Sequence, residues 1–472
     1  MREYELIIDQ ALKNGLSPEE FVPFNTQILA EALGFRCGRL GLEPHKTLSN
    51  ELPSTISMFY NWPFPQFICG ESWNILIVRD SVTNQEDIVY AISSDYSTVT
   101  HIFSVDELTF GKGTMMEVAD FGEYLFMTNG VVMIYWDPNL SAWQVITSSP
   151  TIPMMRTICN FKGQAIGGNI VSAWHGCDET FYIWSKIGSM DFTPDLENDA
   201  GYRRCPFGGV VKNVKRIGNN VVGYSSKGIT LISPVNSPAS TFGFTELDNI
   251  GIINQGAVNG DYHRHVYVGE DYILREVSIQ GELSKIYGVK ELGYQHYMEE
   301  LQGEDIIINY DPHNKDFYIG NSIKTFLLSP YGLSEVMQHP SAVWRLDNKS
   351  SMIPDTIDIT KPVICTEIFD MGYRGQKTIS TIETDSILGL NIEAGSDWAY
   401  DLINWGLEFY KPLNNMGIAT VPITGGMFRF RMRFGTLYET GRLSYIKVRY
   451  KMTDLRGIRG VYAPKIRGQE GE

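Results

Sequence analysis

The stretch YWDPNLSAW, from Tyr135 to Trp143, has an aromatic residue before Asp-Pro and another after four intervening residues. The same arrangement returns in NYDPHNKDF, from Asn309 to Phe317. Asp-Pro favours the start of a turn, and aromatic side chains flanking a turn can pair across the two strands that it joins. The two stretches therefore predict two copies of one unit, a strand, a turn and a second strand.

The chain contains a series of similar strand pairs around these stretches. Short runs rich in Val, Ile, Tyr and Phe are separated by Asn-Gly, Lys-Gly or Gly-x-Asp, which is the pattern of β-hairpins. Residues 61–350 are therefore predicted to form a β-propeller-like domain of repeated strand hairpins, in preference to one large sandwich. The pairs are NILIVRD with DIVYAISSD, YLFMTNGVVMIYW, NNVVGYSSKGITLIS, HRHVYVGEDYILREVSI and DFYIGNSIKTFLLS.

The first sixty residues have a different pattern from the repeats. YELIIDQALKNG has apolar residues at helical spacing, and SPEEF has the Ser, Pro and Glu pattern that opens a helix, which we expect to continue through TQILAEAL. Several prolines follow, up to the stretch NWPFPQF. Residues 1–60 are therefore predicted to form an N-terminal arm with short helices.

The pattern changes again after residue 350. CTEIFDMGYRGQKTISTIETDS and LNIEAGSDWAYDLINW indicate longer alternating strands, which are typical of an antiparallel β-sandwich. We expect a sandwich domain over residues 351–455 and an extended tail over 456–472. The fold class predicted for the whole chain is mainly β.

The N-terminal residues and the cysteines indicate in which compartment the chain is made and whether a metal or disulfides are expected. MREYELIIDQ has charges where a signal peptide needs an apolar core, and the sequence has no apolar run of about 18 residues, so we expect no membrane segment and synthesis in the cytoplasm. The six cysteines contain no CxxC pair, which argues against a zinc site or a disulfide framework. They are interpreted as small core residues.

Motifs that carry chemistry are weak in this sequence. There is no GxSxG, no HExxH and no complete P-loop. DLENDAG (195–201) resembles the start of a calcium loop, but Pro206 stands where a bidentate Glu is required. WHGCD (174–178) and HRH (263–265) are only fragments of a metal site. We expect no cofactor, no metal and no catalysis, although two carboxylates could still meet in a propeller and cleave glycans.

Positive charge is concentrated near the end of an acidic chain. The net charge is −16, yet residues 427–467 hold eleven Lys and Arg against two acidic residues, so the other 431 residues carry −25. Within this segment FRFRMRF and YIKVRYK alternate cations with apolar residues, which places the cations on one face of each strand. If GTLYETGRLS joins the strands as a hairpin, one face carries six cations: Arg429, Arg431, Arg433, Lys447, Arg449 and Lys451.

Three interpretations of this basic face remain open. It is the outer face of a sandwich without further function, a docking face for acidic surfaces of neighbouring subunits or a partner ring, or a contact for DNA phosphates. We favour docking, because the rest of the chain is strongly acidic. Phosphate contact would be independent of sequence and sensitive to salt.

Several segments of the chain together resemble one known group of proteins. They are YIWSKIGSMDFTPD (182–195), VVKNVKRIGNNVVGYSSKGITLI (210–232), ELDNIGIINQGAV (246–258), FDMGYRGQKTISTIE (369–383) and the basic strands with the RGIRG that follows them. These segments and their order resemble the tail-hub, or nozzle, proteins of short-tailed bacteriophages, a group that includes the packaged-DNA stabilisation proteins. The resemblance spans roughly residues 60 to 460.

The resemblance implies a structural virion protein, without catalysis, assembled as a homo-hexameric ring below the portal and the head-to-tail adaptor. Such a ring extends the DNA exit channel, lies close to packaged double-stranded DNA without specific binding, and attaches tail fibres, spikes or a needle. It implies a place in the virion tail after assembly in the host cytoplasm. The alternative is a propeller that binds or cleaves glycans as a receptor-binding protein.

Overall fold

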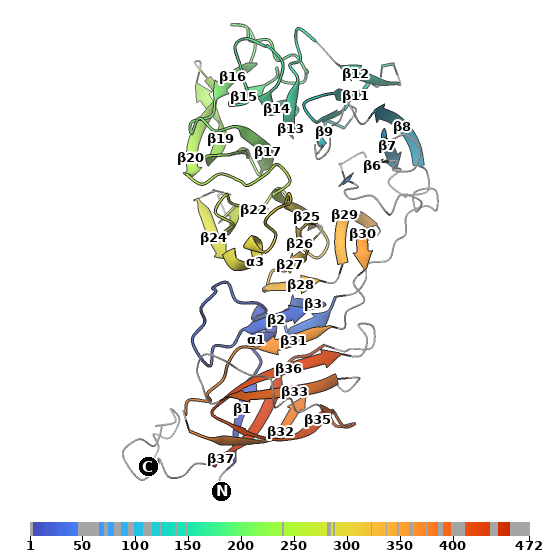
Figure 1. Ribbon diagram of the computed structural model, residues 1–472. Helices are drawn as coiled ribbons and strands as arrows, with labels where there is room; N and C mark the ends of the chain where they lie inside the picture. The colour runs from blue at the N-terminus through green and yellow to red at the C-terminus, as the bar shows by residue number, and fades with distance from the viewer. Residues whose placement is uncertain are drawn as a thin grey trace. The chain divides into compact units, whose positions relative to one another are not determined.

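The chain divides into two compact units in the computed structural model (Figure 1). Unit 1 comprises Met1–Thr47, Thr325–Met337 and Ile357–Glu472, and unit 2 comprises Leu48–Lys324 and Gln338–Thr356. The structure describes residues 3–45, 66–69, 74–79, 86–92, 99–106, 116–122, 124–137, 139–140, 142–146, 149–237, 240–280, 285–286, 288–321, 323–336, 338–346, 349–357, 362–373, 375–385, 390–397, 411–434 and 442–453.

Unit 2 contains five four-stranded antiparallel sheets, formed in chain order from its described residues. Consecutive strands pair within each sheet, as the hairpin pattern predicts. The strands of these sheets are β5 (Gln66–Cys69), β6 (Asn74–Arg79), β7 (Glu86–Ile92) and β8 (Val99–Asp106); β9 (Glu117–Asp120), β10 (Leu125–Thr128), β11 (Met133–Asp137) and β12 (Ala142–Ile146); β13 (Met155–Phe161), β14 (Gln164–Ile170), β15 (Phe181–Trp184) and β16 (Gly201–Arg204); β17 (Val211–Ile217), β18 (Asn220–Ser225), β19 (Gly228–Ser237) and β20 (Ser240–Asp248); and β21 (Val258–Gly260), β22 (Arg264–Val268), β23 (Leu274–Ser278) and β24 (Val289–Gly293).

Helix α3 (Gln295–Glu299), the pair β25 (Ile307–Asp311) and β26 (Asp316–Gly320), and the pair β29 (Gln338–Leu346) and β30 (Lys349–Ile357) follow the fifth sheet. The first strands of successive sheets lie beside one another, as in β9, β13 and β17. Strand β29 contacts both β25 and β5, so the end of the series returns to its beginning. The predicted propeller-like arrangement of repeated strand hairpins is therefore confirmed.

The cores of unit 2 lie between neighbouring sheets. One groups Phe126 and Met133 of the second sheet with Ile158 of the third. Another groups Trp184 of the third sheet with Phe242 of the fourth. Further buried side chains join the fourth sheet to the fifth. The third and fourth sheets are thus apolar on both faces, which is why their strands show continuous apolar runs as well as simple alternation.

Both Asp-Pro stretches form the predicted hairpins. In β11–β12, Asp137 Oδ1 accepts the N–H of Asn139 at 2.9 Å, and in β25–β26, Asp311 Oδ1 accepts the N–H of His313 at 2.8 Å. The aromatic rings pair across the strands, with centroid distances of 5.3 Å for Trp136–Trp143 and 4.7 Å for Tyr310–Phe317. The repeated sequence therefore encodes a repeated local structure.

Unit 1 contains two main sheets that the two ends of the chain build together. One has the order β1-β37-β32-β35, and in the other β27, β28, β2, β31, β36, β33 and β34 follow one another. Contacts between β33 and β35 join the two sheets into a sandwich. The elements are β1 (Glu3–Ile8), α1 (Ala11–Asn14), β2 (Leu29–Leu33), β3 (Phe35–Gly38), β4 (Gly41–Pro44), β27 (Thr325–Leu328), β28 (Leu333–Val336), β31 (Val363–Thr366), β32 (Lys377–Thr384), β33 (Leu390–Asp397), β34 (Lys411–Pro412), β35 (Ile418–Gly425), β36 (Met427–Phe434) and β37 (Ile446–Met452).

The N-terminal segment is mainly strand, and the helix predicted over TQILAEAL is wrong. Its second half is strand β2, which lies between β28 and β31, and these pairings override the helix propensity of Leu, Ala and Glu. Residues 1–47 belong to the same unit as 357–472, where the sequence predicted an arm of its own. None of the described residues forms a helix long and apolar enough to cross a membrane.

Candidate functional site

The two basic strands alternate as predicted. On β36, Phe428, Phe430 and Met432 are buried, whereas the arginines between them are half-buried or exposed. On β37, Ile446 and Val448 are buried and the cations between them are half-buried. The apolar face of each strand therefore packs into the sandwich core, and the cations lie on the outer side of their own sheet.

The predicted hairpin between these strands is wrong. Strand β36 pairs with β31 and β33, and β37 pairs with β1 and β32, so the two strands lie in different sheets. Each strand obtains its hydrogen-bond partners from segments distant in sequence, which local turn signals do not reveal. The residues of GTLYETGRLS from 435 to 441 lie outside the described residues. The six cations thus form two separate groups, not one face.

The cations of β37 are paired with acidic residues of the neighbouring strands. Arg449 contacts Glu5 of β1 at 3.1 Å and Glu383 of β32 at 3.0 Å. Lys447 contacts Glu5 at 3.2 Å, and Lys451 lies 4.0 Å from Glu3. Hydrogen bonds from Lys447 and Arg449 hold the pKa of the Glu5 carboxyl below its ordinary value.

Two cations of β36 are paired in a similar way. Arg431 donates from Nη2 to Oε2 of Glu31 on β2 at 2.6 Å, and Arg429 lies 3.6 Å from Glu367. Glu31, Cys365 and Arg431 stand in one row across β2, β31 and β36. Cys365 is buried, and burial raises the pKa of its thiol to about 12. Arg433 is exposed.

These contacts change what the basic strands can do. Five of the six predicted site residues already face a carboxylate of their own unit. Ion pairs on such partly exposed surfaces contribute modestly to stability, about 0 to 1 kcal/mol each, but they compensate charge. An incoming acidic surface or phosphate must therefore compete with the acids already in place.

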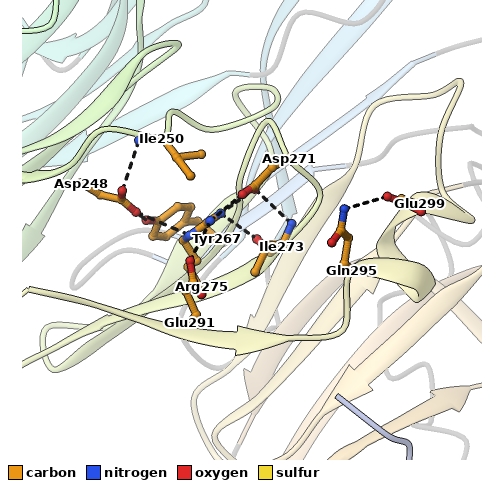
Figure 2. Close-up of polar contacts among 9 residues, drawn as sticks. All are labelled: Asp248, Ile250, Tyr267, Asp271, Ile273, Arg275, Glu291, Gln295 and Glu299. Carbon is orange, nitrogen blue, oxygen red and sulfur yellow. Dashed lines mark hydrogen bonds and ion pairs between the residues drawn. The ribbon is translucent and has the colours of Figure 1, made fainter. Parts of the chain in front are cut away.

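Unit 2 holds a deeply buried charge that the sequence did not single out. Figure 2 shows Arg275 of β23 among Asp248, Asp271 and Glu291. Its Nη1 and Nη2 each donate to one Asp271 oxygen at 2.6 Å, and Nη2 also donates to Glu291 at 3.1 Å. These bonds to Asp271 raise the pKa of the guanidinium above its ordinary value.

The same arginine connects two sheets of the array. Its Nε lies 3.5 Å from Oδ2 of Asp248, the last residue of β20 in the fourth sheet, and Tyr267 of the fifth sheet donates to that oxygen at 3.0 Å (Figure 2). Burial alone would raise the pKa of Asp271, but the guanidinium bonds bring it below its ordinary value. With three carboxylates around one guanidinium, this cluster is best explained as an inter-sheet ion-pair brace.

The fragments of metal sites do not come together in the described part of the chain. His175 is exposed in a turn with φ 46° and lies in edge-to-face contact with Trp174. Cys177 is buried, and burial raises the pKa of its thiol to about 11. His265 is buried, whereas His263 is exposed. Among the described residues, no group of three or more His, Cys, Asp and Glu side chains has a metal-binding arrangement.

A sequence signal for the partners of the basic strands existed. EYE, residues 3 to 5, alternates acidic with apolar side chains, as RYK, residues 449 to 451, alternates basic with apolar ones. Antiparallel pairing of these two stretches places Glu5 opposite Arg449 and Glu3 opposite Lys451. By contrast, only Asp271 lies near Arg275 in the sequence, four residues before it. Asp248 and Glu291 come from other strands, so the sequence does not mark the cluster.

Comparisons with known proteins leave the family open. No protein-family model matches the chain, and no curated protein matches its sequence. Among solved structures, the chain is similar to a crystal structure from Bacteroides uniformis of a protein provisionally named a 6-phosphogluconolactonase. The identity is 12%, the alignment covers 69% of this chain and 93% of that chain, and the TM-score is 0.37. At these values the similarity carries no inference about activity.

Proposed function

We propose that the chain is a structural virion protein, a tail-hub or nozzle subunit that assembles as a homo-hexameric ring below a portal and its adaptor. In this role it extends the DNA exit channel, helps to retain packaged DNA, and attaches fibres, spikes or a needle. It has no catalytic role. Its place is the virion tail, after assembly in the host cytoplasm.

One observation carries the proposal: a propeller-like array is inserted into a β-sandwich unit that both ends of the chain build together. This is the combination of domains that the resemblance to tail-hub proteins implies. Two of the segments that carry the resemblance fall largely on strands, one in each unit. VVKNVKRIGNNVVGYSSKGITLI forms β17, β18 and the first half of β19, and FDMGYRGQKTISTIE leads into and forms most of β32. Because a fold alone does not specify function, the assembly state is the test.

We propose further that the outer cations of β36, Arg429, Arg431 and Arg433, are the docking contacts. Arg429 and Arg431 are held in place by Glu367 and Glu31, so a partner carboxylate would exchange with these acids. The cations of β37 have the same potential role on the other sheet. Contact with DNA phosphates remains the competing role for both groups.

The experiment combines particle imaging with a matched pair of variants. Purified full-length protein is examined by mass photometry and negative-stain electron microscopy, and rings are expected. Arg429→Ser, Arg431→Ser and Arg433→Ser together remove the cations. Glu31→Gln and Glu367→Gln together break two of the same ion pairs and keep the cations. Docking predicts that only the arginine variant loses rings, while both variants lose similar thermal stability.

Equal loss of rings in both variants would show that the ion pairs only support the fold of unit 1. Normal rings in the arginine variant, together with loss of salt-sensitive DNA binding, would assign the cations to phosphate contact. A parent protein that stays monomeric at all concentrations and binds polysaccharide would overturn the proposed function, and would favour a glycan-binding or glycan-cleaving propeller.

A further inference from the structure

Strand β1 lies at the edge of its sheet in unit 1, beside β37 (Figure 1). The two strands are antiparallel, and Glu5 stands opposite Arg449. The Arg449 carbonyl accepts the hydroxyl hydrogen of Ser380 on β32 at 3.1 Å, so the backbone of Arg449 points away from β1. In an antiparallel pair that exchanges no hydrogen bonds, the two backbones point in opposite directions. The N–H and C=O of Glu5 therefore point out of the sheet.

The side chain of Gln27 supports this direction and marks where the open edge ends. It donates from Nε2 to the Ile7 carbonyl at 3.1 Å and accepts the N–H of Asp9 at 3.2 Å, so it stands where a neighbouring strand would stand. Backbone groups alternate in direction along a strand, which places those of Glu3, Glu5 and Ile7 on the outward side. In the described part of the chain, the outward N–H and C=O of Glu3 and Glu5 have no hydrogen-bond partner.

The outer face of this edge carries two carboxylates, those of Glu3 and Glu5. Their side chains are 46% and 48% exposed, so each can accept a further cation. The contacts that they already make come from the side of β37. Lys447 and Arg449 lie 3.2 and 3.1 Å from Oε1 of Glu5, and the Ser380 hydroxyl donates to Oε1 of Glu3 at 2.9 Å. A strand added on the open side would place its own side chains beside these carboxylates, and charge complementarity favours Lys or Arg there.

The inner face of the same edge is incompletely covered. Tyr4 and Leu6 of β1 are half-buried, whereas Tyr450 and Val448, which stand opposite them on β37, are buried. The rings of Tyr4 and Tyr450 stack with their centroids 5.6 Å apart, so the apolar layer of the sheet reaches β1. A further strand with apolar residues on this face would cover Tyr4 and Leu6 and continue the layer. Both faces of β1 thus favour a neighbour in which cations alternate with apolar residues.

We propose that the open edge of β1, from Glu3 to Glu5, is a docking site for an extended segment of a partner protein in which Lys or Arg alternates with apolar residues. The segment adds a strand to the sheet, and its backbone bonds the outward groups of Glu3 and Glu5. Strand β37 shows that such a sequence fits, because it pairs with the other side of β1 through RYK, residues 449–451. Strand β35, at the opposite edge of the sheet, contains Pro422, which has no N–H to donate. The site is independent of the proposed function, because it concerns one sheet edge of a single chain.

The test is fluorescence anisotropy of full-length protein with a labelled synthetic peptide that has the sequence of β37, IKVRYKM. A second peptide has the same composition but three adjacent cations, which cannot share one face of a strand. The parent should bind the alternating peptide at least about tenfold more tightly than the second. Glu5→Pro removes the outward N–H, which takes no part in the pairing with β37, and should weaken binding by about tenfold or more. Glu5→Gln is the matched control, because it loses the same charge but keeps the N–H, and it should bind more tightly than Glu5→Pro.

Hydrogen exchange locates the bound peptide. Saturation with the alternating peptide should protect the N–H groups of Glu3 and Glu5, while the N–H of Val448, which faces β1 in the existing pairing, stays protected.

Several results would overturn the proposal. Absence of binding is one, and equal affinity for the two peptides is another, because it would mean attraction between charges without strand addition. Equal binding by Glu5→Pro and Glu5→Gln would mean that the open edge is not used. Loss of protection at Val448 would mean that the peptide displaces β37. If Glu5→Pro does not fold, exchange in the parent decides, since unchanged protection of the Glu3 and Glu5 N–H groups also overturns the proposal.

Discussion

Acid should destabilise unit 2 through the buried His265, and the size of the loss in folding free energy follows from the pKa of its ring. The ring is buried, Nε2 lies 3.1 Å from the carbonyl of Arg216, and Nδ1 lies 2.9 Å from the hydroxyl of Tyr224. A carbonyl only accepts, so Nε2 carries the hydrogen and Nδ1 accepts from Tyr224. Burial, with the nearby charge of Lys215, lowers the pKa of His265 to about 3.

The magnitude follows from the two pKa values. The unfolded chain takes up a proton on this histidine below its ordinary value of 6.5, whereas the folded chain does so only near 3. The stabilising contribution of the neutral ring is therefore complete above 6.5 and is lost as the pH falls. At about pH 4.5, two units below the ordinary value, the loss is roughly 3 kcal/mol, or about a hundredfold in the folding constant.

The assay is chemical denaturation of the parent and of His265→Gln at about pH 7.5 and about pH 4.5, read by hydrogen exchange in β18 and β22 so that unit 2 is followed by itself. Glutamine can donate to the Arg216 carbonyl and accept from Tyr224, but it does not titrate. The parent should lose about a hundredfold more than the variant on acidification. His263→Gln, at an exposed position two residues away, should behave like the parent. Equal acid sensitivity of the parent and His265→Gln would refute the reasoning.

Three further substitutions test the other buried or paired charges. Arg275→Met leaves Asp248 and Asp271 without their cation and should destabilise unit 2 by about 3 to 5 kcal/mol in urea denaturation. Lys377, whose pKa burial lowers to about 8, binds its proton more weakly when folded, so the parent should gain stability relative to Lys377→Met as the pH rises from 8 towards 10.5. Glu5→Gln should lower the melting temperature at neutral pH, and this difference should shrink as the pH falls below 4.5, because the lowered pKa of Glu5 contributes stability only while the carboxyl is ionised.

The sheets of unit 2 are largely predictable from sequence, because each is made of consecutive strands. The turn chemistry of Asp137 and Asp311 and the strand alternation lie within a few residues of one another, so a local pattern contains them. Unit 1 is built from long-range pairings and is not predictable in this way. Strand β2 has the residues of a helix and becomes a strand only because β28 and β31 lie on either side of it.

The candidate sites divide in the same way, into features that a local sequence pattern predicts and features that depend on long-range contacts. The alternation predicts which side chains of each basic strand share a face, but it does not predict to which sheet each strand belongs. The six cations predicted on one face therefore lie in two groups, one in each sheet. The acidic partner of β37 is visible in EYELI once antiparallel pairing is assumed. The cluster around Arg275 is only partly local. Asp271 lies four residues before Arg275, but Asp248 belongs to the preceding sheet, and the burial of Arg275 depends on contacts that the sequence does not reveal.

Positive charge is concentrated near the end of the sequence, but folding pairs most of these cations with carboxylates of unit 1. This pairing determines how ring assembly should respond to salt. The three cations of β37 face three carboxylates, those of Glu3, Glu5 and Glu383. A docking partner that exchanges one carboxylate for another gains little Coulomb energy per pair, so packing and shape must supply most of the association free energy. Ring assembly should therefore depend weakly on salt, whereas phosphate binding by the same cations would release counterions and fall steeply with log salt concentration. Mass photometry of rings across a salt series measures this slope. A steep slope would contradict this reasoning. It would mean that the cations leave the carboxylates of their own unit and contribute charge directly to the association.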